Sequence, residues 1–101
     1  MDKIIRGTTP TFIYTFNSVT VANIAVAYLT VKQGDEILIE KDLTDATVGQ
    51  KALSWTFTQA ETLSMGDVIK VMLNWRLSDG TRGASAETKL YVTDNHKDEV
   101  I

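Results

Sequence analysis

The chain has 101 residues, no cysteine and a formal net charge of −3, so we expect one domain without disulfides, thiolate metal ligands or a cysteine nucleophile. Its lysines and arginines are scattered and form no basic stripe with interleaved aromatic residues, which argues against a nucleic-acid partner. No apolar run approaches the roughly 20 residues of a membrane span, and the N-terminus lacks a signal-peptide core. The sequence therefore predicts no membrane contact and synthesis in the cytoplasm.

Three strands are predicted in the first half of the chain. Residues 11–16 alternate aromatic with smaller side chains and follow an N-terminal arm of residues 1–10. Residues 24–32 are apolar on both faces, which predicts a strand that is central in its sheet or covered by a partner. A short turn at residues 33–35 then leads into a third strand over residues 37–41.

The next predicted strand covers residues 52–58, and its odd-numbered positions, with Trp55 at the centre, form the expected buried face. Thr58 and Glu61 follow with the spacing of a capping box, in which each side chain binds a free backbone N–H at a helix start. This pattern predicts about one helical turn, and Leu63 is the side chain expected to fill one end of the core.

A long β-hairpin is predicted over residues 68–93, where two alternating arms flank Asp79-Gly80. Asp-Gly favours a tight primed turn because such turns need positive φ, which Gly adopts freely and Asp tolerates. The positions expected to share one side of each arm are Ile69, Val71, Leu73, Trp75 and Leu77, and Ala84, Ala86, Thr88, Leu90 and Val92.

Together these elements predict an all-β fold, an immunoglobulin-like antiparallel β-sandwich of about six or seven strands with one short helical turn. We expect a single domain over residues 1–101, ending in a polar tail at residues 94–101, because no internal repeat or linker divides the chain.

The sequence predicts no enzyme, no catalytic residue, no cofactor and no metal site. His96, the only histidine, lies in the tail and is expected to be solvated. The serines occupy turns or strand faces, and none has the context of a nucleophile elbow. Carboxylates cluster around the third strand with a spacing that matches no calcium loop, so we expect a solubilising strand edge: Asp35, Glu36, Glu40, Asp42 and Asp45.

Three aromatic residues could stack on sugars if they formed an exposed platform: Tyr28, Trp55 and Trp75. Both tryptophans share their strand parity with core leucines, which favours burial. A carbohydrate-binding or cell-surface-binding module is therefore the alternative function.

More apolar surface is present than a small sandwich needs, and such surface in a soluble chain marks protein–protein contact. Terminal arms are also a common means by which subunits lock together. The residues expected at a protein interface are Ile4, Ile5, Ile13, Val100 and Ile101.

Three segments carry a family resemblance: the opening Ile-Ile-Arg-Gly-Thr-Thr-Pro-Thr of residues 4–11, the Gln-Ala-Glu-Thr-Leu corner of residues 59–63, and the Asp79-Gly80 hairpin followed by Ala84-Ser85. Together they resemble a family of small proteins encoded among the structural genes of bacteriophages and prophages of Gram-positive gut bacteria. More distantly, the chain is similar to the immunoglobulin-like N-terminal domain of phage baseplate upper proteins. The resemblance implies a role in the virion or its assembly and supplies no catalytic residue.

The expected function is that of a noncatalytic phage structural or assembly protein of the tail, baseplate or head that acts through protein–protein contacts. Its expected partners are itself, as a homo-oligomer, and other phage structural proteins. The expected location is the bacterial host cytoplasm during synthesis and the virion afterwards.

Overall fold

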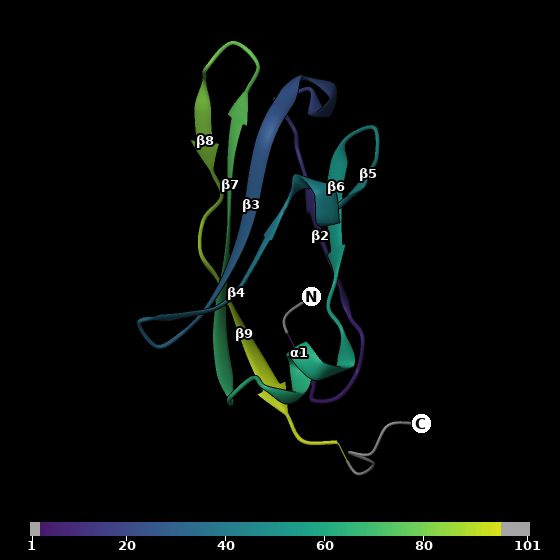
Figure 1. Ribbon diagram of the computed structural model, residues 1–101, viewed down its shortest axis with the longest axis vertical. Helices are drawn as coiled ribbons and strands as arrows, with labels where there is room; N and C mark the ends of the chain where they lie inside the picture. The colour runs from purple at the N-terminus through teal and green to yellow at the C-terminus, as the bar shows by residue number, and fades with distance from the viewer. Residues whose placement is uncertain (1–2, 96–101) are drawn as a thin grey trace.

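The computed structural model describes residues 3–95 and shows two β-sheets packed face to face (Figure 1). The larger sheet contains β1 (Lys3–Ile5), β3 (Ile24–Gln33), β4 (Glu36–Asp42), β7 (Val68–Leu77), β8 (Arg82–Ala84) and β9 (Thr88–Thr93). The smaller sheet contains β2 (Thr11–Thr15), β5 (Thr47–Val48) and β6 (Ala52–Thr56). Helical segments in this part of the chain are α1 (Gln59–Leu63) and the 3₁₀ turns at Val21–Asn23 and Leu43–Asp45.

The strand order is β1-β9-β7-β3-β4 in the larger sheet and β2-β6-β5 in the smaller one, and β8 pairs with the upper part of β7. All neighbouring strands are antiparallel except β1, which runs parallel to β9. This is the order of the GFCC′ and BED sheets of an immunoglobulin-like sandwich, which confirms the predicted fold class. Residues 3–95 contain nine strands, more than the six or seven expected, because the short β1, β5 and β8 carry little sequence pattern.

The core lies between the facing sheets, and its central side chains are fully buried. The larger sheet contributes Leu29, Val31, Ile69, Val71, Leu73 and Leu90, and the smaller sheet with its continuation contributes Leu53, Trp55 and Phe57. Trp55 also donates its indole N–H to the backbone oxygen of Asp42 at 2.9 Å, so its one polar atom is satisfied at the edge of the core. The predicted burial of Trp55 is confirmed.

The helix α1 closes the lower end of the sandwich in Figure 1, and both hydrogen bonds of the predicted capping box are present. The Thr58 hydroxyl accepts the Glu61 N–H at 3.1 Å, and the Glu61 carboxylate accepts the Thr58 N–H at 2.7 Å. The residue that enters the core is Thr62, which is fully buried, whereas Leu63 is 38% exposed. The expectation for Leu63 is therefore wrong by one residue, because a single helical turn presents only one position to the core.

Thr62 ties α1 to the N-terminal segment. Its hydroxyl accepts the N–H of Gly7 at 3.0 Å and donates to the carbonyl of Thr8 at 2.7 Å. Gly7 has a φ of 84°, a conformation that side chains disfavour. Arg6 lies beside it, donates to the Met65 carbonyl at 3.0 Å and forms ion pairs with Asp67 and Asp94. The opening segment is thus fixed to the sandwich at several points.

The N-terminal arm expected over residues 1–10 is in part a strand of the sandwich. β1 pairs with β9 through the register Ile4↔Val92, and Ile4 is only 1% exposed. A three-residue strand that pairs with the other end of the chain leaves no local periodicity to detect. Ile4 is therefore a core residue, and its predicted role as a surface contact is wrong.

The predicted long hairpin is present, but its turn and its second arm differ from expectation. Only Gly80 has positive φ within the turn, which excludes the expected primed turn centred on Asp79-Gly80, since both primed types need positive φ at the first central residue, Asp79. The second arm is broken between β8 and β9. β8 pairs with β7 through Asn74↔Ala84, whereas β9 pairs through Ile69↔Leu90, so the register shifts by one residue. This shift turns Ala84 to the uncovered face while Leu90 enters the core.

Ser85 stabilises the break between β8 and β9 through two hydrogen bonds to the backbone of Leu73. Its backbone N–H donates to the Leu73 carbonyl at 2.8 Å, and its hydroxyl accepts the Leu73 N–H at 2.9 Å. The side chain thereby replaces the ladder partner that the shift removes, and no backbone group of Leu73 is left unpaired.

Candidate functional site

The larger sheet has one face against the smaller sheet and one uncovered face, which we call the outer face. Strand alternation and register place on it Val26, Tyr28, Thr30 and Lys32 of β3, Lys70, Met72, Asn74 and Arg76 of β7, and their cross-strand neighbours Lys3, Ile5, Ile37, Glu40, Asp42, Arg82, Ala84, Lys89 and Tyr91. This is the candidate functional site, because it is a broad surface that the domain itself leaves uncovered.

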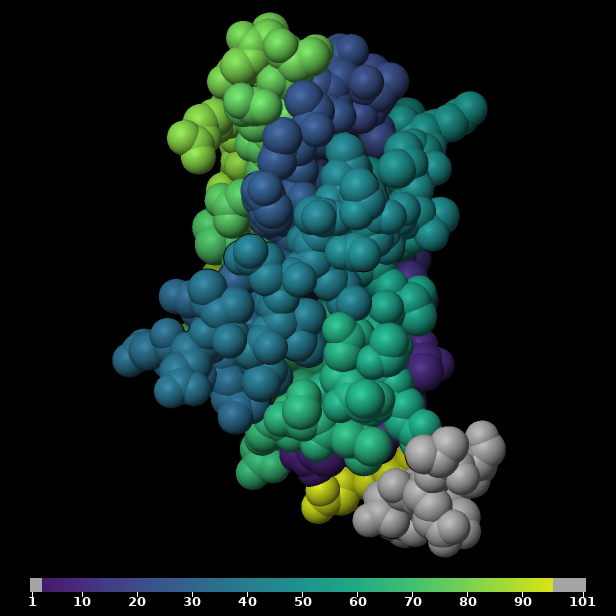
Figure 2. Space-filling view, in the orientation of Figure 1, coloured from purple at the N-terminus to yellow at the C-terminus, as the bar shows by residue number. Residues whose placement is uncertain are grey.

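Most of the exposed large apolar side chains of residues 3–95 lie on the outer face, on both sides of β7. Within residues 3–95, four of the seven exposed large hydrophobic residues lie there: Ile5, Tyr28, Ile37 and Tyr91, while Ile13, Val48 and Leu63 lie elsewhere. Figure 2 shows the β3–β4 turn, next to Ile37, protruding from the body of the molecule. Grouped apolar exposure of this kind is typical of contact surfaces rather than of scattered surface residues.

Like charges face each other across the strands of the outer face. Arg76 pairs with Arg82 in the β7–β8 register. Lys70 pairs with Lys32 on one side and Lys89 on the other. Directly opposed like charges destabilise a sheet. The arrangement therefore costs stability in the free protein, and a gain elsewhere must account for it.

These cations are only weakly neutralised within the described chain. Lys70 lies 3.9 Å from Glu87, an exposed pair of little energetic worth. Among residues 3–95, neither Arg76 nor Arg82 has an ion pair. Glu40 and Asp42 stand apart from these cations on β4, so Glu87 is the one acid within residues 3–95 that lines the surface beside the lysines. The face thus has an acidic edge on β4 and a mainly basic centre.

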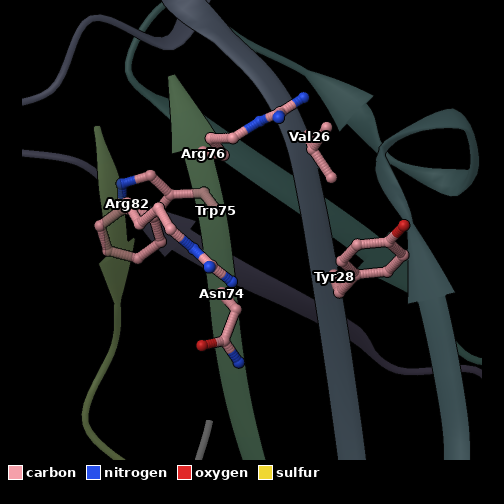
Figure 3. Close-up of a pocket in the computed structure, with 6 residues that line it drawn as sticks. All are labelled: Val26, Tyr28, Asn74, Trp75, Arg76 and Arg82. Atoms are coloured by element: carbon pink, nitrogen blue, oxygen red, sulfur yellow. The ribbon is translucent and has the colours of Figure 1, made fainter. Parts of the chain in front are cut away.

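The arginine pair borders a shallow hollow of about 380 Å³. Its lining consists of Val26, Tyr28, Asn74, Trp75, Arg76 and Arg82. Figure 3 shows Arg76 extending from β7 toward Val26 and the guanidinium of Arg82 reaching toward Asn74, with Tyr28 on the neighbouring strand. The hollow therefore combines two cations, an amide and an aromatic ring.

A second hollow of about 230 Å³ continues along the same strands. It is lined by Thr30, Lys32, Lys70, Met72, Asn74 and Glu87. Because Asn74 borders both hollows, they form one shallow groove along β3 and β7, with the arginine pair near one end and the lysine row near the other.

The structure separates the residues that the sequence places at an interface. Ile5 is 44% exposed on the outer face, and Ile13 is 63% exposed on the opposite surface, in β2. The two cannot contribute to one flat contact. Val100 and Ile101 lie outside the described residues, as does His96.

The three aromatic residues considered for sugar stacking do not form a common platform. Trp55 is fully buried. Trp75 is half-buried and packs edge-to-face on Phe16, with ring centroids 5.0 Å apart, and beside Tyr14 at 5.8 Å. Only Tyr28 is an exposed aromatic of the three. The sugar-stacking surface proposed from all three residues is therefore absent.

The acids around β4 have a structural role. Asp42 caps the 3₁₀ turn at Leu43–Asp45: its carboxylate accepts the Thr44 N–H at 2.9 Å, and its own N–H donates to the Asp45 carboxylate at 3.1 Å. Hydrogen bonds to the Asp42 carboxylate from the hydroxyl and N–H of Thr44 and from the N–H of Asp45 hold the pKa of Asp42 below its usual value. Across residues 3–95, no group of three His, Asp or Glu side chains has an arrangement that could hold a metal ion. The described part of the chain also has no helix long and apolar enough to cross a membrane.

The opposed cations are the feature that the sequence pattern did not reveal. The alternation within β7 places Arg76 and Lys70 on one face, but the pairing of Arg76 with Arg82 follows only from the observed hairpin loop of residues 78–80, which the hydrogen bond from the Leu77 N–H to the Thr81 carbonyl closes. In comparisons with known proteins, the chain matches no protein-family model and no curated sequence.

Proposed function

We propose that this chain is a noncatalytic structural or assembly protein that acts through protein–protein contacts made by the outer face. The resemblance of its opening, corner and hairpin segments to small phage structural-gene products favours a bacteriophage tail, baseplate or head as the assembly, and the virion as the final location.

The observation that supports the proposal most strongly is the grouping of exposed apolar residues on one uncovered sheet face. Ile5 and Tyr91 lie on adjacent strands, since the β1–β9 register sets Tyr91 opposite Lys3 and Thr93 opposite Ile5. Both side chains are about half exposed, at 44% and 54%. Interfaces between proteins are enriched in tyrosine and in apolar side chains at their centres, and this pair supplies both.

The test is assembly measured by light scattering after size exclusion, with the protein alone and mixed with the products of neighbouring structural genes. The double variant Ile5→Ser, Tyr91→Ser should lose the associated species. Ile13→Ser is the control, because it removes an even more exposed apolar side chain from the opposite surface. Both variants must retain the wild-type circular dichroism spectrum and melting temperature.

Three results would count against the proposal in different ways. If Ile13→Ser alone abolished association, the contact would lie on the smaller sheet. If the wild-type protein were monomeric and bound none of those gene products, the protein–protein role would be refuted. A gene that is not flanked by virion genes would refute the assignment to a phage particle.

A further inference from the structure

The outer face carries a charge pattern that its proposed contact role does not explain by itself. Two rows of opposed cations lie on it, Arg76 with Arg82, and Lys32 with Lys70 and Lys89. Arg76 lies six positions after Lys70 on β7. This separation corresponds to roughly 20 Å along a strand. The groove of the two hollows runs between the rows.

We infer that the outer face binds an extended acidic segment of a partner protein, with carboxylates at the arginine pair and at the lysine row. The inference deepens the proposed function, because it names the chemistry of the partner for the same surface. A guanidinium presents parallel N–H donors that match the two oxygens of a carboxylate, and Arg76 and Arg82 present two such groups at one hollow. An extended segment of about seven residues reaches from one row to the other.

The surface between the rows favours a peptide over a uniform polyanion. Tyr28, Thr30 and Met72 stand between the cations, where a phosphate chain would have no counter-charge but an uncharged peptide stretch would pack well. Glu40 and Asp42 of β4 lie across the strand ladder from Thr30 and Tyr28 of the groove, and the whole chain carries a net charge of −3. Both features repel a long nucleic acid or polyphosphate, whereas a peptide with separated carboxylates avoids the acidic edge.

A second copy of this chain is a poorer occupant than an acidic partner. In a face-to-face dimer whose two-fold axis runs along the strands, the lysine row of one copy would lie against the lysine row of the other. Like charges brought together at an interface cost several kcal/mol. The cations of the outer face also outnumber its acids, which are Glu40, Asp42 and Glu87, so a second copy could not neutralise them.

The test is fluorescence anisotropy of the full chain with a labelled peptide of roughly ten residues that has two glutamates at each end and uncharged residues between. The expected result is saturable binding that weakens as salt is raised. A peptide with glutamines in place of the glutamates should bind at least tenfold more weakly. No saturation at millimolar acidic peptide, or equal binding of the glutamine peptide, would overturn the inference.

The variants Arg82→Gln and Lys70→Gln should each weaken binding of the acidic peptide by on the order of tenfold, the scale of a lost charge-assisted hydrogen bond. Lys51→Gln is the matched control, since Lys51 is an exposed cation of the β5–β6 turn, away from the outer face, and it should leave binding unchanged. Arg82→Gln should also raise the melting temperature slightly, because it relieves the repulsion from Arg76. Equal losses in Arg82→Gln and Lys51→Gln would mean attraction by net charge alone and would overturn the assigned site.

Oligo-deoxythymidine and inorganic polyphosphate complete the set of probes. If either bound more tightly than the peptide, with the same dependence on Arg82, the partner would be a polyanion other than a protein. A failure of the peptide together with a loss of assembly in Ile5→Ser, Tyr91→Ser would refute only the acidic partner. The proposed function fails separately, when the wild-type protein associates with nothing.

Discussion

Trp75 lies directly across the β7–β8 ladder from Gly83, and its indole ring occupies the space where a side chain at Gly83 would stand. A Cβ placed on Gly83 would come within 2.5 Å of the ring. The ring packs in turn on Phe16 of the facing layer. The glycine therefore lets one aromatic residue seal the upper end of the sandwich.

Gly83→Ala should destabilise the fold by about 1–3 kcal/mol, because the added methyl group must displace a packed ring. Urea unfolding followed by tryptophan fluorescence measures this change. Gly66→Ala is the control, since the nearest atoms there belong to the flexible end of Gln33. Equal stability of Gly83→Ala and wild type would show that the ring has free space to move.

Thr62→Val keeps the shape of a fully buried side chain and removes its hydroxyl. The N–H of Gly7 and the carbonyl of Thr8 then lose their partner, which should cost about 1–3 kcal/mol. Thr62→Ser retains the hydroxyl and loses only a methyl group, so it should be the more stable of the two in chemical unfolding. The reverse order would show that packing, and not hydrogen bonding, fixes this residue.

Ile4 and Ile5 are neighbours in sequence with opposite environments, 1% and 44% exposed. Ile4→Ala should cost about 2–5 kcal/mol by opening a cavity in the core. Ile5→Ala should change stability by no more than about 0.5 kcal/mol, as expected of an exposed site. Thermal unfolding of the two variants compares them directly, and similar losses would contradict the placement of β1 in the sheet.

Glu61 makes stability depend on pH. Burial opposes its charge, but hydrogen bonds from Thr58 and the Lys41 ammonium, 2.9 Å away, lower the pKa of Glu61 below its ordinary value of 4.5. Because the folded pKa is the lower one, this stabilisation is present above pH 4.5 and is lost as the pH falls through the folded pKa.

Glu61→Gln should therefore be less stable than wild type at neutral pH, by about 1 kcal/mol for the altered cap, and the difference should shrink on acidification below pH 4.5. Denaturant titrations of both proteins across that range give the comparison. Asp42 and Asp79 also have lowered pKa values. Both residues are present in the wild type and in the variant, so their contributions to the pH dependence cancel in the stability difference. A difference that stays constant with pH would exclude the carboxylate as its source.

Local signals in the sequence were sufficient for most of the sandwich. Alternation predicted β2, β3, β6 and β7, and the parity of Trp55 predicted its burial, because a strand with one covered face imposes a period of two on its side chains. The capping box predicted α1 because it is also a local signal: both of its hydrogen bonds join residues three positions apart.

Features that depend on distant pairing could not be predicted in this way. β1 is a strand only because β9 lies beside it, and nothing within three residues signals that contact. The opposition of Arg76 and Arg82 needs the register of β8, which the hairpin turn sets through the hydrogen bond from the Leu77 N–H to the Thr81 carbonyl. The exposed surface was correctly expected at Ile5 and Ile13, but their placement on opposite surfaces required the topology.

The break at Ser85 gives the last arm of the sandwich two separable halves. β9 pairs with β7 on one side and with β1 on the other. β8 pairs with β7 alone, through three residue pairs, and the Ser85 hydroxyl next to it accepts the Leu73 N–H. Amide protons of Arg82–Ala84 should therefore exchange with solvent through a local opening that leaves the amides of β9 protected. Substitutions of the exposed Arg82 side chain would then alter what the hairpin recognises while the folding unit beneath it stays intact, whereas the Trp75 ring restricts the neighbouring Gly83 to glycine.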